Sequence, residues 1–225
     1  MSAVEMKLPE ASVEAPHESK IRLLKSALDV IRAKGYAGTT VDDICHRAGI
    51  TKGSFFHHFK SKDELALAAA AYWTSLTEGF FAAAPFRKSK DPLDRLFGYL
   101  EFRETILSAE IPEYTCLLGT LIQETYETHP EIRSACDRGM SSHIAVLTGD
   151  IEAAKQLYVP TAQWSAESVG YFIQAVLQGS FIFAKAKQSP DVVRDNLAHL
   201  RRYLGLLFGQ TLNDFPGVAC LRSGS

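Results

Sequence analysis

Residues 35–65 decide the fold, and they read GYAGTTVDDICHRAGITKGSFFHHFKSKDEL. Near the start of this stretch Thr40 offers a capping hydroxyl, and Asp43 follows three residues later. A hydroxyl followed at this spacing by an acidic side chain is typical of a helix N-terminus, because each side chain can bond to the other residue's backbone N–H. The pattern predicts a helix over residues 41–48, and Gly49 then supplies the backbone freedom for a sharp turn.

A second, very short helix follows this turn. Thr51 caps it, and it extends to about Phe59. Two short helices joined by a tight turn form a helix-turn-helix, in which the second helix can lie in the major groove of DNA. Its first residues are Lys52, Gly53 and Ser54, of which the last two are small enough to permit close approach to base edges. The groove-facing surface is therefore predicted at the start of this helix.

Helices are also predicted on both sides of this pair. Residues 18–34 form an amphipathic helix that ends at Gly35, and Ser61 caps a longer helix that continues to about Ala84. Further helices are predicted over residues 92–109, 112–129, 131–154, 166–187 and 190–209, with a loop over 157–165. About nine helices and no strand result, so the expected fold class is all-α.

Composition limits the function classes. The chain has 225 residues and a net charge of −2, which argues against a protein wrapped in nucleic acid or bound to anionic lipid. Residues 17–65 nevertheless hold nine Lys and Arg against six Asp and Glu, whereas residues 66–225 hold fourteen against seventeen. The short N-terminal part is the basic part, as expected if it contacts DNA.

Cysteine usage and hydropathy predict a cytoplasmic protein. The four cysteines lie far apart without a Cys-x-x-Cys spacing and are expected to be reduced thiols: Cys45, Cys116, Cys136 and Cys220. No segment holds eighteen consecutive apolar residues, and the N-terminus lacks the apolar core of a signal peptide, so no membrane association is expected. We expect a disordered arm over 1–17 and a tail over 211–225.

Residues 18–65, with the quoted stretch at their centre, closely resemble the DNA-binding domain of the TetR family of transcriptional regulators. The resemblance implies an all-helical homodimer with an N-terminal helix-turn-helix domain over 18–65 and an effector-binding, dimer-forming domain over 66–210. It also implies base contacts at Thr51, Lys52, Gly53 and Ser54, and contacts to the DNA backbone at Thr40, Phe56, His58 and Lys62.

The residue types favour similar positions. Hydroxyl, imidazole and ammonium groups suited to phosphate surround the short second helix, at Thr39, Thr40, His57, His58, Lys60 and Lys62. Phe56 departs from the family pattern, because many relatives carry a tyrosine there that donates its hydroxyl to a phosphate. The apolar residues Val41, Ile44, Ile50, Phe55 and Phe59 are expected to form the small core that holds the helix pair together.

Other interpretations of these residues exist. His57 and His58 could be plain surface residues; because neighbours on a helix point in different directions, a shared metal site is not expected. Lys60 and Lys62 could be a solvated pair next to a helix, as charged residues usually are. Their position beside a groove-ready helix favours phosphate contacts.

The last two helices suggest a dimer interface. Residues 166–187 are apolar on nearly every side, and residues 190–209 carry apolar side chains at steps of three and four. Together they resemble half of a four-helix bundle that a second subunit completes, although they could also finish the core of a monomer. Two subunits would allow a near-palindromic operator to be read as two half-sites.

An effector pocket is predicted from aromatic and small polar residues in the middle of the chain. Such residues can line an apolar cavity, or they can be ordinary core. The candidates are Trp73, Phe80, Phe97, Cys116, Thr120, Gln123 and Tyr126. Cys116 lies in a Thr-Cys-Leu-Leu-Gly segment that resembles a TetR subgroup in which some members respond to electrophiles or oxidants. Pro112 places this thiol near a helix start, where it could be activated, although free cysteines are commonly buried.

These observations predict a repressor that is released from its operator when a small-molecule effector or a thiol modification changes the spacing of the two recognition helices. No cofactor, metal or catalytic residue is expected. An all-helical enzyme using Glu124, Glu127 or His129 is one rival, but nothing pairs these residues at a catalytic spacing. A helical ligand carrier that has lost DNA binding is the other, and Phe56 offers it slight support.

Overall fold

The chain folds into helices. A computed structural model describes residues 18–108 and 110–210, and in these ranges it contains α-helices and two 3-10 helices but no strand. The helices are α1 Glu18–Lys34, α2 Val41–Ala48, α3 Lys52–His58, α4 Lys62–Ala82, η1 Pro85–Lys88, α5 Pro92–Thr105, η2 Ile106–Ser108, α6 Ile111–Tyr114, α7 Leu117–Thr125, α8 Pro130–Tyr158, α9 Ala166–Lys187 and α10 Asp191–Leu207. The predicted all-α class is confirmed. The expected arm, the expected tail and Cys220 lie outside the described residues.

The chain divides into two compact units. The first contains residues up to Arg87 together with 106–144, and the second contains residues 88–105 and those from Ala145 onward. The division falls inside α8. The predicted boundary between residues 65 and 66 separates a DNA-binding domain from an effector-binding domain, not two compact units. It stays a prediction.

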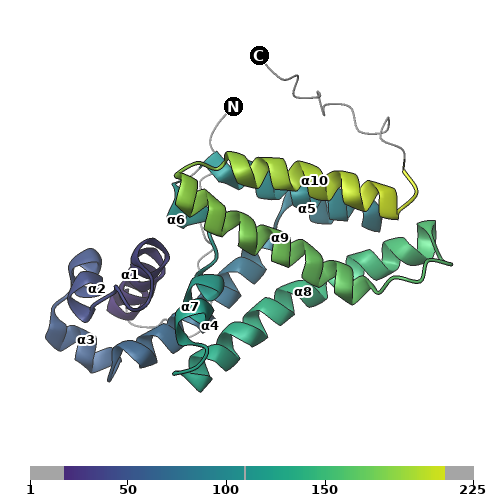
Figure 1. The fold of residues 1–225 in the computed structure, drawn as a ribbon. Coiled ribbons are helices and arrows are strands. Elements are labelled where there is room, and N and C mark those ends of the chain that lie inside the picture. Colours follow the sequence, from purple (N-terminus) through teal and green to yellow (C-terminus); the bar gives the residue numbers. More distant parts are fainter. Residues whose placement is uncertain (1–17, 109, 211–225) are drawn as a thin grey trace, which may run out of the picture. The chain divides into compact units, whose positions relative to one another are not determined.

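In the first unit, α1 packs against α2, α3, α4, α6 and α7 (Figure 1). The small core predicted for the helix pair is confirmed, because Ile44, Phe55 and Phe59 are buried and Val41 and Ile50 pack against them partly buried. Burial of these large side chains fixes α2 and α3 on α1, at roughly 1.5–3 kcal/mol for each fully buried one. This packing holds the predicted recognition helix in place.

In the second unit, α10 packs against both α9 and α5 (Figure 1). Its core contains Leu96 of α5, Ile173 of α9 and Leu204 of α10, all fully buried. A polar contact lies within this core, where Gln174 Nε2 donates to the hydroxyl of Tyr99 at 3.0 Å. In both units of the described chain, no helix combines the length and apolar character that crossing a membrane requires.

The single helix predicted over 112–129 is wrong, because the structure places two helices there. α6 ends at Tyr114, and both Thr115 and Cys116 adopt extended backbone conformations before α7 begins. Cys116 caps α7, with its sulfur accepting from Gly119 N at 3.4 Å, while the Thr115 hydroxyl donates to Pro112 O at 3.2 Å. These side-chain bonds satisfy backbone groups that a continuous helix would have paired internally.

Candidate nucleic-acid interface

The start of α2 has the predicted geometry. The Thr40 hydroxyl accepts from Asp43 N at 3.1 Å, and Asp43 Oδ2 accepts from Thr40 N at 3.0 Å, so the capping box is complete. A hydrogen bond from Lys34, at 2.7 Å, and those from Thr40 lower the pKa of Asp43 to about 2. Asp43 therefore stays ionised and keeps this end of α2 fixed. Gly49 ends the helix with φ of 64°, as the glycine turn requires.

The residues predicted to face DNA lie on the outer side of α3. Thr51 caps the helix by accepting from Ser54 N at 3.2 Å. Lys52 and Gly53 are exposed and Ser54 is half-buried, while Phe55 on the opposite side is fully buried. A Cβ at Gly53 would meet only the Thr51 hydroxyl, at 3.8 Å, among the described residues. Internal packing therefore does not require a glycine there.

Two further predicted contacts are also exposed. Phe56 is 55 % exposed, and its ring packs edge-on against that of Phe55, with centroids 5.1 Å apart. His57 is exposed as well. An exposed phenylalanine on the outer side of a DNA-binding helix can touch a sugar or a thymine methyl, but it cannot donate to phosphate.

Four of the residues predicted to contact phosphate have partners inside the protein. His58 Nε2 lies 2.6 Å from the Ser19 hydroxyl of α1. Lys62 donates to the carbonyls of Tyr36 and Thr39, at 3.0 Å each. Thr39 is buried, and its hydroxyl donates to Gly35 O at 2.6 Å, so its burial does not favour the predicted phosphate contact. Thr40 is exposed, and its hydroxyl is engaged in the capping box with Asp43.

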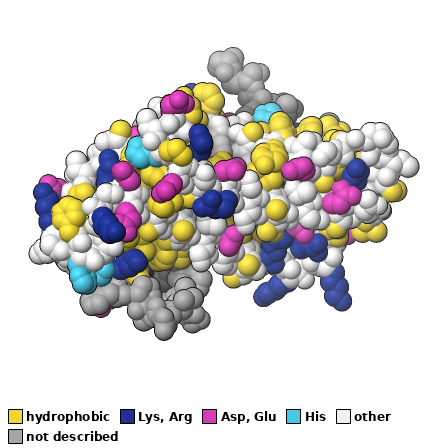
Figure 2. Space-filling model, turned by 90° about the horizontal axis from the view of Figure 1, so that it is seen from below, with side chains coloured by type: hydrophobic (Ala, Val, Ile, Leu, Met, Phe, Trp, Pro, Cys, Tyr) yellow, Lys and Arg dark blue, Asp and Glu magenta, His cyan; other side chains and the backbone are white. Residues whose placement is uncertain are grey.

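Charges of both signs surround this surface. Lys52 forms an exposed ion pair with Asp42 at 2.8 Å. Figure 2 shows that Lys and Arg (dark blue) and Asp and Glu (magenta) are interspersed over the visible face of the molecule. With a net charge of −2, the position of individual groups rather than overall charge must determine where phosphate binds.

The predicted effector-pocket residues are divided between the two units. Phe97 belongs to the second unit, where it is buried beneath Arg201, whereas the other six belong to the first unit. Trp73 is buried, Phe80 is half-buried, and Tyr126 is 57 % exposed. Cys116 and Thr120 lie on successive turns of α7, with the Thr120 hydroxyl donating to Cys116 O at 3.1 Å, and Gln123 next to them is exposed. The pocket stays a prediction.

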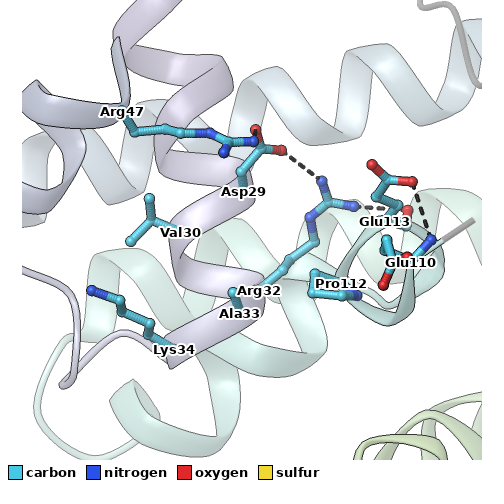
Figure 3. Close-up of a pocket in the computed structure, with 9 residues that line it drawn as sticks. All are labelled: Asp29, Val30, Arg32, Ala33, Lys34, Arg47, Glu110, Pro112 and Glu113. Atoms are coloured by element: carbon cyan, nitrogen blue, oxygen red, sulfur yellow. Dashed lines mark hydrogen bonds and ion pairs between the residues drawn. The ribbon is translucent and has the colours of Figure 1, made fainter. Parts of the chain in front are cut away.

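Sequence reasoning missed a cavity of about 320 Å³ bordered by α1, α2 and α6. Figure 3 shows the guanidinium of Arg32 pointing from α1 toward Glu113 of α6. Arg32 donates to Glu113 O at 2.8 Å and to Asp29 at 3.2 Å, and Arg47 reaches the same Asp29 at 3.1 Å. The sequence held one signal of a buried arginine: Arg32 lies four positions after Leu28, on the apolar side of its helix.

We expect Arg32→Ala to lower the free energy of unfolding by about 2–4 kcal/mol, because it removes three hydrogen bonds from a buried guanidinium that also stacks on Trp73 at 4.9 Å. Burial lowers the pKa of Arg32, so this charge depends on its partners. Urea unfolding measures the change. Arg47→Ala is the matched control, since Arg47 is 62 % exposed and pairs with the same Asp29; its loss is expected to cost under about 1 kcal/mol. Equal losses for the two variants would contradict the expectation.

Comparisons with known proteins agree with this architecture. Residues 23–69 match the family model for bacterial regulatory proteins of the tetR family, and residues 98–199 match that for the C-terminal domain of LmrA/YxaF-like transcriptional regulators. The HTH-type transcriptional repressor NemR of Escherichia coli is 24 % identical over 193 residues, covering 84 % of this chain and 94 % of that protein. The transcriptional regulator AcuR of Cereibacter sphaeroides is 27 % identical over 189 residues, covering 81 % of each.

Solved structures show the same fold. The reduced form of E. coli NemR matches with a TM-score of 0.71 and 22 % identity, over 83 % of this chain and 96 % of that one. A regulatory protein TetR from Rhodobacter sphaeroides matches with a TM-score of 0.74 and 23 % identity, over 84 % and 98 %. The chain belongs to the TetR family of transcriptional regulators. It is a DNA-binding transcriptional regulator and not an enzyme, as the sequence predicts.

Proposed function

We propose that the chain is a cytoplasmic repressor that binds a near-palindromic operator as a homodimer and leaves it when a small molecule or a thiol modification acts on the C-terminal domain. The observation that carries the proposal is the start of α3, where Lys52 and Gly53 are exposed while Phe55 is fully buried and fixes the helix in the core. Such a surface suits close approach to base edges. A cytoplasmic location follows from the need to reach the chromosome.

The dimer is supported by an exposed apolar face on the last two helices. On α9 the exposed or half-buried residues Phe172, Val176, Gly179 and Phe183 follow one another at steps of three and four. Phe172 lies beside Tyr203 of α10, with ring centroids 4.9 Å apart, so the face continues onto that helix. A contiguous exposed apolar face of this kind marks an interaction surface, and a second copy supplies the same face by two-fold symmetry.

The direct test is selection of bound fragments from a random DNA pool by the purified full-length chain. We expect a sequence with two related half-sites whose centres lie about 10 base pairs, or a multiple of this, apart. Its affinity should fall steeply as salt rises, because each phosphate contact releases counterions. Failure to enrich any sequence, together with binding that is indifferent to salt, would support a ligand carrier that has lost DNA binding.

The thiol branch of the proposal makes its own prediction. Cys45 and Cys136 are buried, burial raises the pKa of both thiols, and that of Cys136 reaches about 12, whereas Cys116 is half-buried. In a Cys220→Ser background, N-ethylmaleimide should modify Cys116 at least about tenfold faster than the other two, because the thiolate is the reacting form. Mass spectrometry of digested protein measures this.

The same labelled protein tests the response. We expect modified protein to lose operator affinity and Cys116→Ser protein to be insensitive to the reagent. The reduced form of NemR is the related structure that supports looking for such a response. If Cys116 reacts and operator affinity is unchanged, the thiol branch is wrong and a small-molecule effector remains.

A further inference from the structure

The carboxylate of Glu124 joins α7 to the loop between α1 and α2. Its Oε1 accepts from the backbone N–H of Tyr36 at 3.0 Å, and its Oε2 accepts from that of Ala37 at 2.7 Å. Both segments belong to the same compact unit. Hydrogen bonds to an ionised acceptor are stronger than neutral ones, and two parallel bonds also fix orientation.

A negative charge at the position of Glu124 does not stabilise α7 itself. It lies in the last turn of α7, where the helix dipole disfavours a negative charge. The loop is adapted to the carboxylate as well. Gly35 has a φ of 80°, and a Cβ added there would collide with Oε1 and lie only 3.2 Å from Cδ of Glu124. The backbone conformation therefore favours a glycine, and any side chain at this position would displace the Glu124 carboxylate.

The loop held in this way leads directly into the DNA-binding surface. Lys62 donates to two backbone carbonyls of the loop, those of Tyr36 and Thr39. Glu124 accepts from two of the loop's backbone N–H groups. The next residue is Thr40, the N-cap of α2, and α2 packs on α3. A shift of the loop would consequently move Thr40 and the end of the helix that positions α3.

We propose that Glu124 is a positioning residue of the DNA-binding surface, through which α7 sets the place of Thr40 and α2. The inference rests on the proposed function. α7 begins next to Cys116 and is fixed in the core by Leu117 and Leu121. Its nine residues form a rigid rod about 13 Å long, so a displacement at its start reaches the loop through the Glu124 carboxylate.

Two substitutions separate the charge of Glu124 from its reach. Glu124→Gln keeps the length but loses the charge and one acceptor oxygen, whereas Glu124→Asp keeps the charge but is one methylene too short to reach both N–H groups. Glu127→Gln is the control, because Glu127 is exposed, lies three residues further on, and changes the net charge equally. The readouts are hydrogen exchange of a peptide containing Tyr36 and Ala37, and affinity for the operator selected by the full-length chain.

We expect both Glu124 variants to exchange the two N–H groups about tenfold faster and to bind the operator about three- to tenfold more weakly, which corresponds to the net loss of one ordinary hydrogen bond. Glu127→Gln should change neither readout in this direction. Unchanged exchange in Glu124→Gln, or faster exchange with the operator affinity of the control, overturns the inference. If wild-type protein selects no DNA at all, the proposed function fails first, and the exchange data then report only a structural contact.

Discussion

Replacing Phe172 and Phe183 of α9 together by glutamate is expected to convert the regulator into monomers. The two side chains are 43 % and 55 % exposed, and they lie on one stripe of α9 with the half-buried Val176 between them. In a dimer each substitution would bury a charge without a partner, twice because of the symmetry, at a cost of several kcal/mol per buried charge. The same substitutions leave the single chain folded, since both side chains already face outward.

Sedimentation at micromolar concentration measures the oligomeric state, and the selected operator measures the consequence. We expect the affinity to fall by at least about a hundredfold, because a monomer keeps the base contacts of one half-site and each good contact is worth roughly 1–3 kcal/mol. Leu157→Glu is the matched control, since Leu157 is 62 % exposed but lies on α8, outside this stripe. A variant that remains dimeric would place the interface elsewhere.

The sequence predicts this face only indirectly. Residues 166–187 are apolar on nearly every side, and a helix of this kind needs cover all round. The structure separates the two classes of residue: Ile173 and Leu177 are buried against the rest of the unit, whereas Phe172 and Phe183 are exposed. Periodicity cannot make this distinction, because the neighbours of a helix are set by residues far away in the chain.

Local signals explain why the helix-turn-helix could be predicted closely. The hydroxyl of Thr40, the hydroxyl of Thr51 and the glycine at 49 act within three or four residues of where they stand. The contacts that connect this domain to α6 and α7 have no local signature. Arg32 meets Glu113 across 81 residues and Glu124 meets Ala37 across 87, so only the folded chain brings them together.

The break between α6 and α7 likewise has no local signature in the sequence. Pro112 is a strong helix-start signal, and nothing between it and Pro130 resembles a helix end. The chain breaks instead at Thr115, which is buried, and restarts at Cys116, a residue seldom used as an N-cap. Burial of Thr115 and Tyr114 outweighs the local preference for a continuous helix.

Gly53→Glu is expected to separate folding from DNA binding. The residue occupies the second position of α3, and a Cβ there has room, since its nearest described neighbour would be 3.8 Å away. Replacing a helical glycine is favourable by up to about 1 kcal/mol, and a carboxylate in the first turn also suits the helix dipole. The free energy of unfolding should therefore stay the same or rise by roughly 0.5–1 kcal/mol.

Operator binding should respond in the opposite direction. If α3 lies in the major groove, the glutamate places bulk and negative charge where Lys52, Gly53 and Ser54 are predicted to meet bases, and we expect at least about a hundredfold loss of affinity. Ala71→Glu, at an exposed position of α4, carries the same charge change and should cost far less. Because a stabilised protein that no longer binds DNA cannot be explained by misfolding, this pair of variants isolates the groove contact; operator affinity that matched the Ala71 variant would remove α3 from the interface.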